Sequence, residues 1–204
     1  MMVLVSGATK TLPKMDPELT GILVTPRRGY SEEFLSRWRW AADNEAYSQW
    51  DADAFMRMLW RLRGVSGCLF VSAPDVVANA KKTRRLWDIW RPALEGFPRA
   101  YVIQNGEDGS TVPWDDCQAV FVGGDTDWKL GPEARTLVAK AKTLSKWVHM
   151  GRVNTGPRWR YALDLGCDSI DGSGFSRWPD EMLRRLTLWR DDRKRQPTLE
   201  LDTP

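Results

Sequence analysis

Polar side chains and glycines follow short apolar runs along this chain, at the places where a buried strand would end. Asp43 follows Trp40–Ala42, and Asp171 follows Ser169–Ile170. Chemistry at a glycosidic bond needs one carboxylate against the sugar and a proton donor or acceptor at the leaving group. The full set of polar positions at these ends contains such groups: Asp43, Asn44, Asp75, Gln104, Gly123, Gly124, Asp125, His149, Asp168 and Asp171.

A purine-like leaving group also needs hydrogen-bond partners along its edge. Asp75 and Gln104 carry suitable groups. Gly123 and Gly124 would let backbone N–H groups approach an exocyclic oxygen closely, since glycine has no side chain. These four residues are therefore candidates for binding a base.

Two of the aspartates are assigned to ordinary structural roles. An aspartate after a strand is often a helix cap or a turn former, and we assign Asp125 and Asp168 to this class. Asp168 would brace the turn that presents Asp171.

The elements that position these residues alternate between strand and helix, which favours an α/β fold with a parallel sheet. Strands buried along their length and polar at their carboxyl ends are typical of a TIM-like barrel. The predicted strands are Ile22–Thr25, Trp40–Ala42, Cys68–Val71, Ala100–Ile103, Ala119–Val122, Trp147–Val148 and Ser169–Ile170. Helices are expected over 51–62, after Asp75 as a long helix that ends at Gly96, and over 132–144, 157–165 and 179–190. Leu165–Cys167 is interpreted as a further apolar run ahead of Asp168.

The extent of the barrel stays open at this point. Met2–Val5 either supplies an eighth strand or the barrel is incomplete. Residues 1–190 are expected to form one domain, because this length is enough for a single core. Residues 191–204 are charged and poor in apolar anchors, which predicts a flexible tail.

Composition excludes several classes of protein. No apolar stretch approaches the length of a membrane span and no signal segment is evident, so we expect a cytoplasmic protein. Cys68, Cys117 and Cys167 are widely spaced and His149 is the only histidine, which argues against a zinc site. We expect no metal and no cofactor.

The 12 tryptophans often stand beside arginine, although the net charge is only +3. Such surfaces can stack bases and hold phosphates. For most of them we favour the simpler interpretation, in which tryptophan fills the interface between helices and barrel. Candidate phosphate contacts near strand ends are Arg27, Arg28, Arg152, Arg158 and Arg160.

The order of the polar clusters resembles the tRNA-guanine transglycosylase superfamily, and most closely its small phage members that insert 7-deazaguanines into DNA. Gly166–Asp171 is similar to the family's Gly-x-Asp-x-Phe-Asp, whose last aspartate is the nucleophile. Asp75 resembles its base-recognising aspartate. Ala42–Tyr47 is a degenerate counterpart of its Ser-Asp-Ser-Gly-Gly-Phe-Gln, and Gln104–Gly106 of its Gln-Gly-Gly.

Two further segments continue the same order. Gly123–Trp128 stands where the family has Gly-Gly-Leu-Ala-Val-Gly, and His149–Gly151 resembles the start of its His-x-x-Gly-x-Gly. The likeness covers Gly21 to Pro179. The chain departs from the family because it is short, lacks the zinc cluster after the nucleophile and lacks the body of the second glycine-rich loop. Since the zinc region helps to meet tRNA in that family, its absence favours DNA.

The resemblance implies a double displacement. Asp171 would attack the anomeric carbon of a guanosine nucleotide, and Asp43 would protonate the departing guanine and then deprotonate the incoming base. Implied contacts with the base and nucleotide are Asn44, Asp75, Gln104, Gly123, Gly124, His149 and Gly151. The implied partners are DNA and a free 7-deazaguanine base.

Three alternatives remain open. The substrate is tRNA instead of DNA, or water completes the reaction and releases the base, or the chain is a non-catalytic nucleic-acid-binding module derived from the fold. The oligomeric state is also open, since the family's dimer forms through the missing zinc region.

Overall fold

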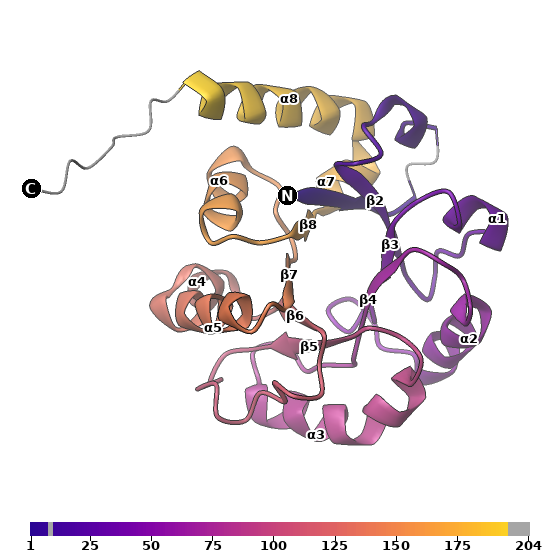
Figure 1. Cartoon of the computed structure of the whole chain (residues 1–204), viewed down its shortest axis with the longest axis vertical. Helices are drawn as coiled ribbons and strands as arrows, with labels where there is room; N and C mark the ends of the chain where they lie inside the picture. Colours follow the sequence, from indigo (N-terminus) through magenta and orange to yellow (C-terminus); the bar gives the residue numbers. More distant parts are fainter. Residues whose placement is uncertain (8–9, 196–204) are drawn as a thin grey trace, which may run out of the picture.

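A closed barrel of parallel strands forms the centre of the molecule in the computed structural model, which describes residues 1–7 and 10–195 (Figure 1). Neighbouring strands pair in sequence order from β1 to β8, and β8 returns to β1. The strands are β1 Met2–Val5, β2 Thr20–Val24, β3 Trp40–Ala42, β4 Cys68–Ser72, β5 Arg99–Ile103, β6 Ala119–Val122, β7 Trp147–Met150 and β8 Ser169–Asp171. The predicted TIM-like α/β barrel is confirmed.

Met2–Val5 answers the question that the sequence left open. Val3 pairs with Thr20 of β2 on one side and with Ile170 of β8 on the other. All four residues of β1 are buried. The barrel is therefore complete, with β1 as its eighth member.

Helices surround the barrel (Figure 1). They are α1 Glu32–Leu35, α2 Ala52–Leu62, α3 Ala80–Trp90, α4 Thr126–Leu130, α5 Pro132–Thr143, α6 Gly156–Asp164, α7 Ser173–Arg177 and α8 Pro179–Arg195, with 3₁₀ turns at Leu12–Lys14 and Arg91–Leu94. Asp51 caps α2, because its Oδ1 accepts a hydrogen bond from the Ala54 N–H at 2.9 Å. Asn79 caps α3 in the same way, through the Lys82 N–H.

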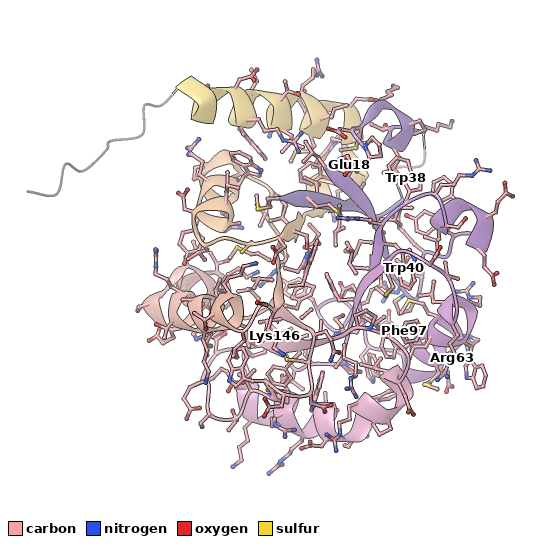
Figure 2. The ribbon with its side chains drawn as sticks, in the orientation of Figure 1. Glu18, Trp38, Trp40, Arg63, Phe97 and Lys146 are labelled. Atoms are coloured by element: carbon pink, nitrogen blue, oxygen red, sulfur yellow. The ribbon has the colours of Figure 1, made fainter. Side chains whose placement is uncertain are left out.

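Two apolar layers hold this architecture together. The barrel interior contains Leu4, Leu23 and Phe70, and the larger layer lies between the strands and the helices. Trp40 and Trp87 are fully buried in that larger layer, as the simpler interpretation of the tryptophans predicted. Figure 2 shows Trp40 among the interior side chains and the charged Arg63 at the periphery.

The segment before β8 differs from the prediction. Leu165 and Gly166 end α6 and turn the chain, with Gly166 at a φ of 79°, so Leu165–Cys167 is not a strand. Asp168 consequently lies at the amino end of β8, away from the carboxyl-end cluster. Its carboxylate binds Lys142 Nζ at 2.7 and 2.8 Å and accepts the Val148 N–H at 2.7 Å. These contacts tie β8 to β7 and α5.

The last helix is longer than predicted. α8 continues to Arg195, five residues beyond its expected end at Arg190, and residues 196–204 lie outside the described part of the chain. Within the described ranges, no helix is long and apolar enough to cross a membrane. Those ranges also contain no cluster of three His, Cys, Asp or Glu side chains that could hold a metal ion.

A matched pair of isoleucines tests the packing of β8. Ile170 is completely buried and Ile89 on α3 is 68% exposed. Replacing Ile170 with alanine should lower the free energy of unfolding by about 2–5 kcal/mol, because it leaves a cavity in the core. Ile89→Ala should change it by less than about 0.5 kcal/mol. Urea denaturation of both variants checks the prediction, and equal effects would contradict the placement of β8.

Candidate functional site

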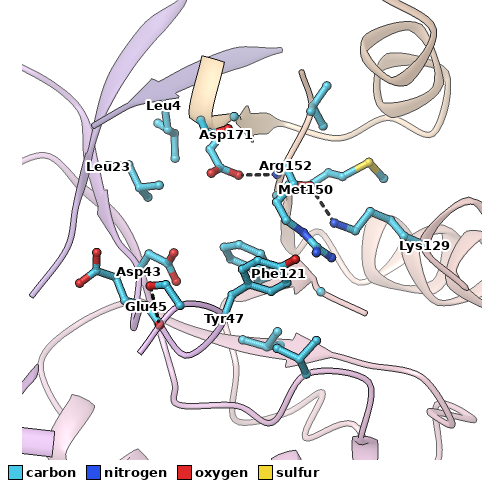
Figure 3. Close-up of a pocket in the computed structure, with 18 of the residues that line it drawn as sticks. Leu4, Leu23, Asp43, Glu45, Tyr47, Phe121, Lys129, Met150, Arg152 and Asp171 are labelled. Atoms are coloured by element: carbon cyan, nitrogen blue, oxygen red, sulfur yellow. Dashed lines mark hydrogen bonds between the residues drawn. The ribbon is translucent and has the colours of Figure 1, made fainter. Parts of the chain in front are cut away.

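A cavity of about 660 Å³ opens at the carboxyl ends of the strands (Figure 3). This volume lies within the range of about 300–1,000 Å³ that is usual for small-molecule sites. Parallel strands bring all their carboxyl ends to one edge, so polar residues far apart in the sequence meet there. The predicted residues that line the cavity are Asp43, Asn44, Asp75, Gln104, Gly123, Gly124, Gly151, Arg152, Arg158 and Asp171.

Four predicted residues lie elsewhere. His149 is 0% exposed and lies inside the barrel beneath Asp171, so it does not line the cavity. Arg27 is at the surface and donates a hydrogen bond to Gln49 Oε1 at 2.9 Å. Arg28 is exposed and Arg160 is half-buried on α6, and neither lines the cavity.

Asp75 is held by two buried amides. Its Oδ1 accepts a hydrogen bond from Asn44 Nδ2 at 2.8 Å, and its Oδ2 accepts one from Gln104 Nε2 at 2.7 Å. Asn44 is fixed in turn by donating to the Ala73 carbonyl at 2.7 Å. Both carboxylate oxygens keep further lone pairs. Asp75 is therefore a preoriented hydrogen-bond acceptor on the cavity wall.

The backbone N–H groups of the glycine pair after β6 form hydrogen bonds within the protein. The Gly123 N–H donates to the Ile103 carbonyl at 3.0 Å, and the Gly124 N–H donates to Gln104 Oε1 at 2.7 Å. Both N–H groups have partners within the protein in this structure, and their use for a base oxygen stays a prediction. A Cβ on Gly123 would lie 2.5 Å from Gln104 Nε2. The glycine is needed there because Gln104 packs against it.

Asp43 lies where burial and negative charge both act on its carboxyl group. Burial, followed by the charges of Asp171 and Asp75, raises the pKa of Asp43 to about 7. Burial also raises the pKa of Asp75 to about 6, although the hydrogen bonds from Asn44 and Gln104 oppose the shift. Asp43 can therefore exchange a proton near neutral pH, which is the property of a general acid or base.

Asp171 ends β8 and lies across the cavity from Asp43 (Figure 3). Its Oδ1 accepts the backbone N–H of Arg152 at 3.0 Å and lies 3.4 Å from His149 Nε2. A Cβ on Gly151 would lie 3.2 Å from the same oxygen, so glycine leaves room for the carboxylate. Asp171 is 20% exposed at its side chain, and therefore accessible from the cavity.

Lys129, Arg177 and Tyr47 are among the lining residues that were not predicted from the sequence as site residues. Lys129 on α4 is only 6% exposed and donates from Nζ to the Gly151 carbonyl at 2.8 Å. Burial, with a smaller contribution from Arg152, lowers the pKa of Lys129 to about 7. Arg177 lies six residues after Asp171 in the sequence, and Tyr47 belongs to the loop after β3. No local pattern marks Lys129 or Arg177, whereas Tyr47 lies inside the Ala42–Tyr47 segment.

Arg152 connects three of the strand-end loops. Its guanidinium stacks 4.4 Å from the centre of the Tyr47 ring and donates to the Gly124 carbonyl. Arg152 itself has a φ of 63°, a conformation that costs free energy for a residue with a side chain. The strained backbone directs its N–H at Asp171 while its side chain covers the cavity.

No family model matches the sequence of this chain, and no curated protein is significantly similar to it. A TIM-like barrel supports many unrelated activities, so the fold does not specify the function. The function must be argued from the cavity residues and their chemistry.

The raised pKa of Asp43 makes a prediction about stability. Between about pH 4 and pH 7 the unfolded chain has lost a proton that folded Asp43 keeps, so this residue makes stability fall as pH rises through that window. The side chain introduced by Asp43→Asn cannot ionise, so the free energy of unfolding of this variant, relative to wild type, should be higher at about pH 8 than at about pH 5. Urea denaturation of both proteins at these two pH values measures the difference.

Asp125→Asn is the matched control for this trend. Hydrogen bonds from the Trp128 backbone and Asn105 lower the pKa of Asp125, so it titrates below the window. Asparagine also preserves the helix cap. If the difference in free energy of unfolding between Asp43→Asn and wild type does not change with pH, or if Asp125→Asn shows the same pH dependence, the assigned environment of Asp43 is contradicted.

Proposed function

We propose that this protein is a transglycosylase that exchanges guanine in DNA for a 7-deazaguanine base, such as 7-cyano-7-deazaguanine. The observation that carries the proposal is the set of carboxylates in one cavity, contributed by three strand-end loops. Asp43 titrates near neutrality, Asp171 is accessible, and Asp75 is fixed as an acceptor. Each of these properties serves a different step of base exchange.

The first step is attack by Asp171 on the anomeric carbon of the target nucleotide. A bond forms between a carboxylate oxygen and C1′ while the bond from C1′ to the base nitrogen breaks, and the electron pair leaves with the base. Asp43 supplies the proton that neutralises the departing guanine. A covalent glycosyl–enzyme ester and free guanine result.

The second step reverses these roles. Asp43, now ionised, removes a proton from the ring nitrogen of the incoming base, and that nitrogen attacks C1′ as the bond to Asp171 breaks. Two inversions give net retention of configuration. Because a pKa of about 7 lets Asp43 act in both directions at neutral pH, one residue serves both steps.

Recognition of the base is assigned to Asp75. The Watson–Crick edge of guanine presents adjacent N–H donors, and a carboxylate can accept from both. A 7-deazaguanine has the same edge, because it differs from guanine on the other side of the ring system. Asp75 is held from behind by Asn44 and Gln104, so the free lone pairs of the carboxylate serve the base.

DNA is the proposed partner, with tRNA as the alternative. Arg152, Arg158 and Arg177 line the cavity and are suited to the phosphates beside the target nucleotide. A guanine within a duplex must first leave the base stack, which costs a few kcal/mol. The choice of DNA over tRNA rests on the sequence resemblance. The tRNA-acting members of the family that this chain resembles carry a zinc cluster after the nucleophile, and this sequence has no such cluster there.

The direct test is a base-exchange assay. Purified protein is incubated with guanine-containing DNA or, separately, with tRNA and labelled 7-cyano-7-deazaguanine, and the nucleosides are analysed by mass spectrometry. Wild type should place label in DNA. Asp171→Asn and Asp43→Asn should each lower the rate by at least about 100-fold, because each removes a group that acts on the reacting atoms.

Asp125→Asn is the control, since Asp125 caps α4 and does not line the cavity. It should keep the wild-type rate within about twofold. Label in tRNA alone would overturn the choice of substrate. Abasic sites without incorporation would indicate a base-releasing glycosidase, and no reaction with either nucleic acid would favour a non-catalytic binding module.

Base recognition makes a separate prediction. Asp75→Asn replaces an acceptor by a group that presents an N–H toward the donors of the base. The KM for the incoming base should rise by about 100-fold or more, because the N–H donors of the base would then face another N–H donor instead of an acceptor. Steady-state exchange kinetics measure this change, and an unchanged KM would remove Asp75 from base recognition.

A further inference from the structure

A chain of three polar side chains, Trp147, Ser169 and His149, lies beneath Asp171 inside the barrel, and the last two are fully buried. Trp147 and His149 are two residues apart on β7, and Ser169 and Asp171 are two apart on β8, so each pair faces the same side of its strand. His149 and Ser169 are partners in the register of the two strands. Ser169 and His149 are each 0% exposed. Their hydrogen bonds must therefore be satisfied within the protein.

The direction of the hydrogen bonds follows from the chemistry of the groups. The indole N–H of Trp147 can only donate, and it lies 2.8 Å from Ser169 Oγ. His149 Nδ1 lies 2.8 Å from the same oxygen. Within the described part of the chain, Trp147 and His149 are the only partners of the Ser169 hydroxyl group. Its hydrogen therefore has one acceptor, Nδ1, which must carry no proton.

The other ring nitrogen points at the nucleophile. A neutral imidazole without a proton on Nδ1 carries it on Nε2, and Nε2 lies 3.4 Å from Asp171 Oδ1. The Arg152 N–H reaches the same oxygen at 3.0 Å. None of the hydrogen bonds among the described residues reaches Oδ2. Two donors thus converge on one oxygen of the carboxylate and leave the other free.

We propose that Trp147 and Ser169 hold His149 in its Nε2–H tautomer, so that His149 and the Arg152 backbone fix Oδ1 of Asp171 and leave Oδ2 to attack the sugar. This inference deepens the proposed function and rests on Asp171 being the nucleophile. His149 is a positioning residue, since it lies below the cavity and touches no substrate. The 3.4 Å separation is compatible with this role, because catalytic hydrogen bonds commonly shorten when the substrate is bound.

Two aromatic rings pack against the imidazole. The His149 ring packs 4.6 Å from the Phe121 ring and 5.2 Å from the Phe70 ring, measured between ring centres. Phe121 also lines the cavity (Figure 3). Neither ring offers a strong hydrogen-bond group, so among the described residues Ser169 and Asp171 are the hydrogen-bond partners of the imidazole.

The tautomer can be measured directly, because the chain contains only one histidine. A long-range ¹H–¹⁵N correlation spectrum of protein labelled in histidine should show a protonated Nε2 and an unprotonated Nδ1. Asp171→Asn should shift the Nε2 resonance, whereas Asp125→Asn should leave it unchanged. A protonated Nδ1, in either the neutral or the doubly protonated ring, would overturn the proposal. This spectrum needs no substrate, so its outcome is independent of whether base exchange occurs.

Kinetics supply the second readout. His149→Leu removes the donor and should lower kcat for base exchange by about 100-fold, the cost of a misplaced reacting group, while KM for the base stays unchanged. His149→Gln keeps an N–H near the position of Nε2 and should recover kcat to within about tenfold of wild type. Phe70→Leu is the control for packing around the ring and should change kcat by less than about threefold. Equal losses in the leucine and glutamine variants would contradict a positioning role.

Discussion

Closure of the barrel by β1 is the constraint on which the site depends. The backbone N–H of Met2 donates to the Asp168 carbonyl at 2.8 Å, and Leu4 is the register partner of Asp171. This pairing makes β8 an interior member of the sheet instead of an edge strand. Because the ring is closed, the carboxyl end of β8 faces the loops after β3 and β4 across a single opening. The four residues of β1 thus determine that Asp171 shares a cavity with Asp43 and Asp75.

Three carboxyl groups in one partly buried opening repel one another, and the surrounding structure separates their properties. Asp75 receives an amide N–H on each oxygen, and Asp171 receives a backbone N–H on one. The side-chain hydrogen bond that reaches Asp43 comes from the Ser72 hydroxyl group and is long, at 3.4 Å. The negative charge is therefore less favourable on Asp43, whose pKa is raised to about 7, than on Asp75, whose pKa is raised to about 6. In the proposed mechanism, an acid, an acceptor and a nucleophile arise from one residue type because their neighbours differ.

The sequence predicts the fold well and the site in part, for identifiable physical reasons. Apolar runs ending in polar clusters placed seven strands correctly and left Met2–Val5 as one of two alternatives, which only its pairing with β2 and β8 decides. All-buried strands carry no alternation of polar and apolar residues, so nothing in the sequence indicated that His149 points into the barrel. The positions of Gly123 and Gly124 were predictable from the cluster order. That Gln104 already accepts the Gly124 N–H depends on side-chain packing across two loops, which no local pattern encodes.

The covalent intermediate tests the central claim most directly. Protein mixed with guanine-containing DNA in the absence of a competing base would be denatured, digested and examined by peptide mass spectrometry. Our account predicts a nucleotide ester on the peptide that contains Asp171. The ester should disappear when 7-cyano-7-deazaguanine is added before denaturation and should be absent from Asp171→Asn. Base exchange without any adduct, or an adduct on another residue, would contradict the assignment of Asp171 as the nucleophile.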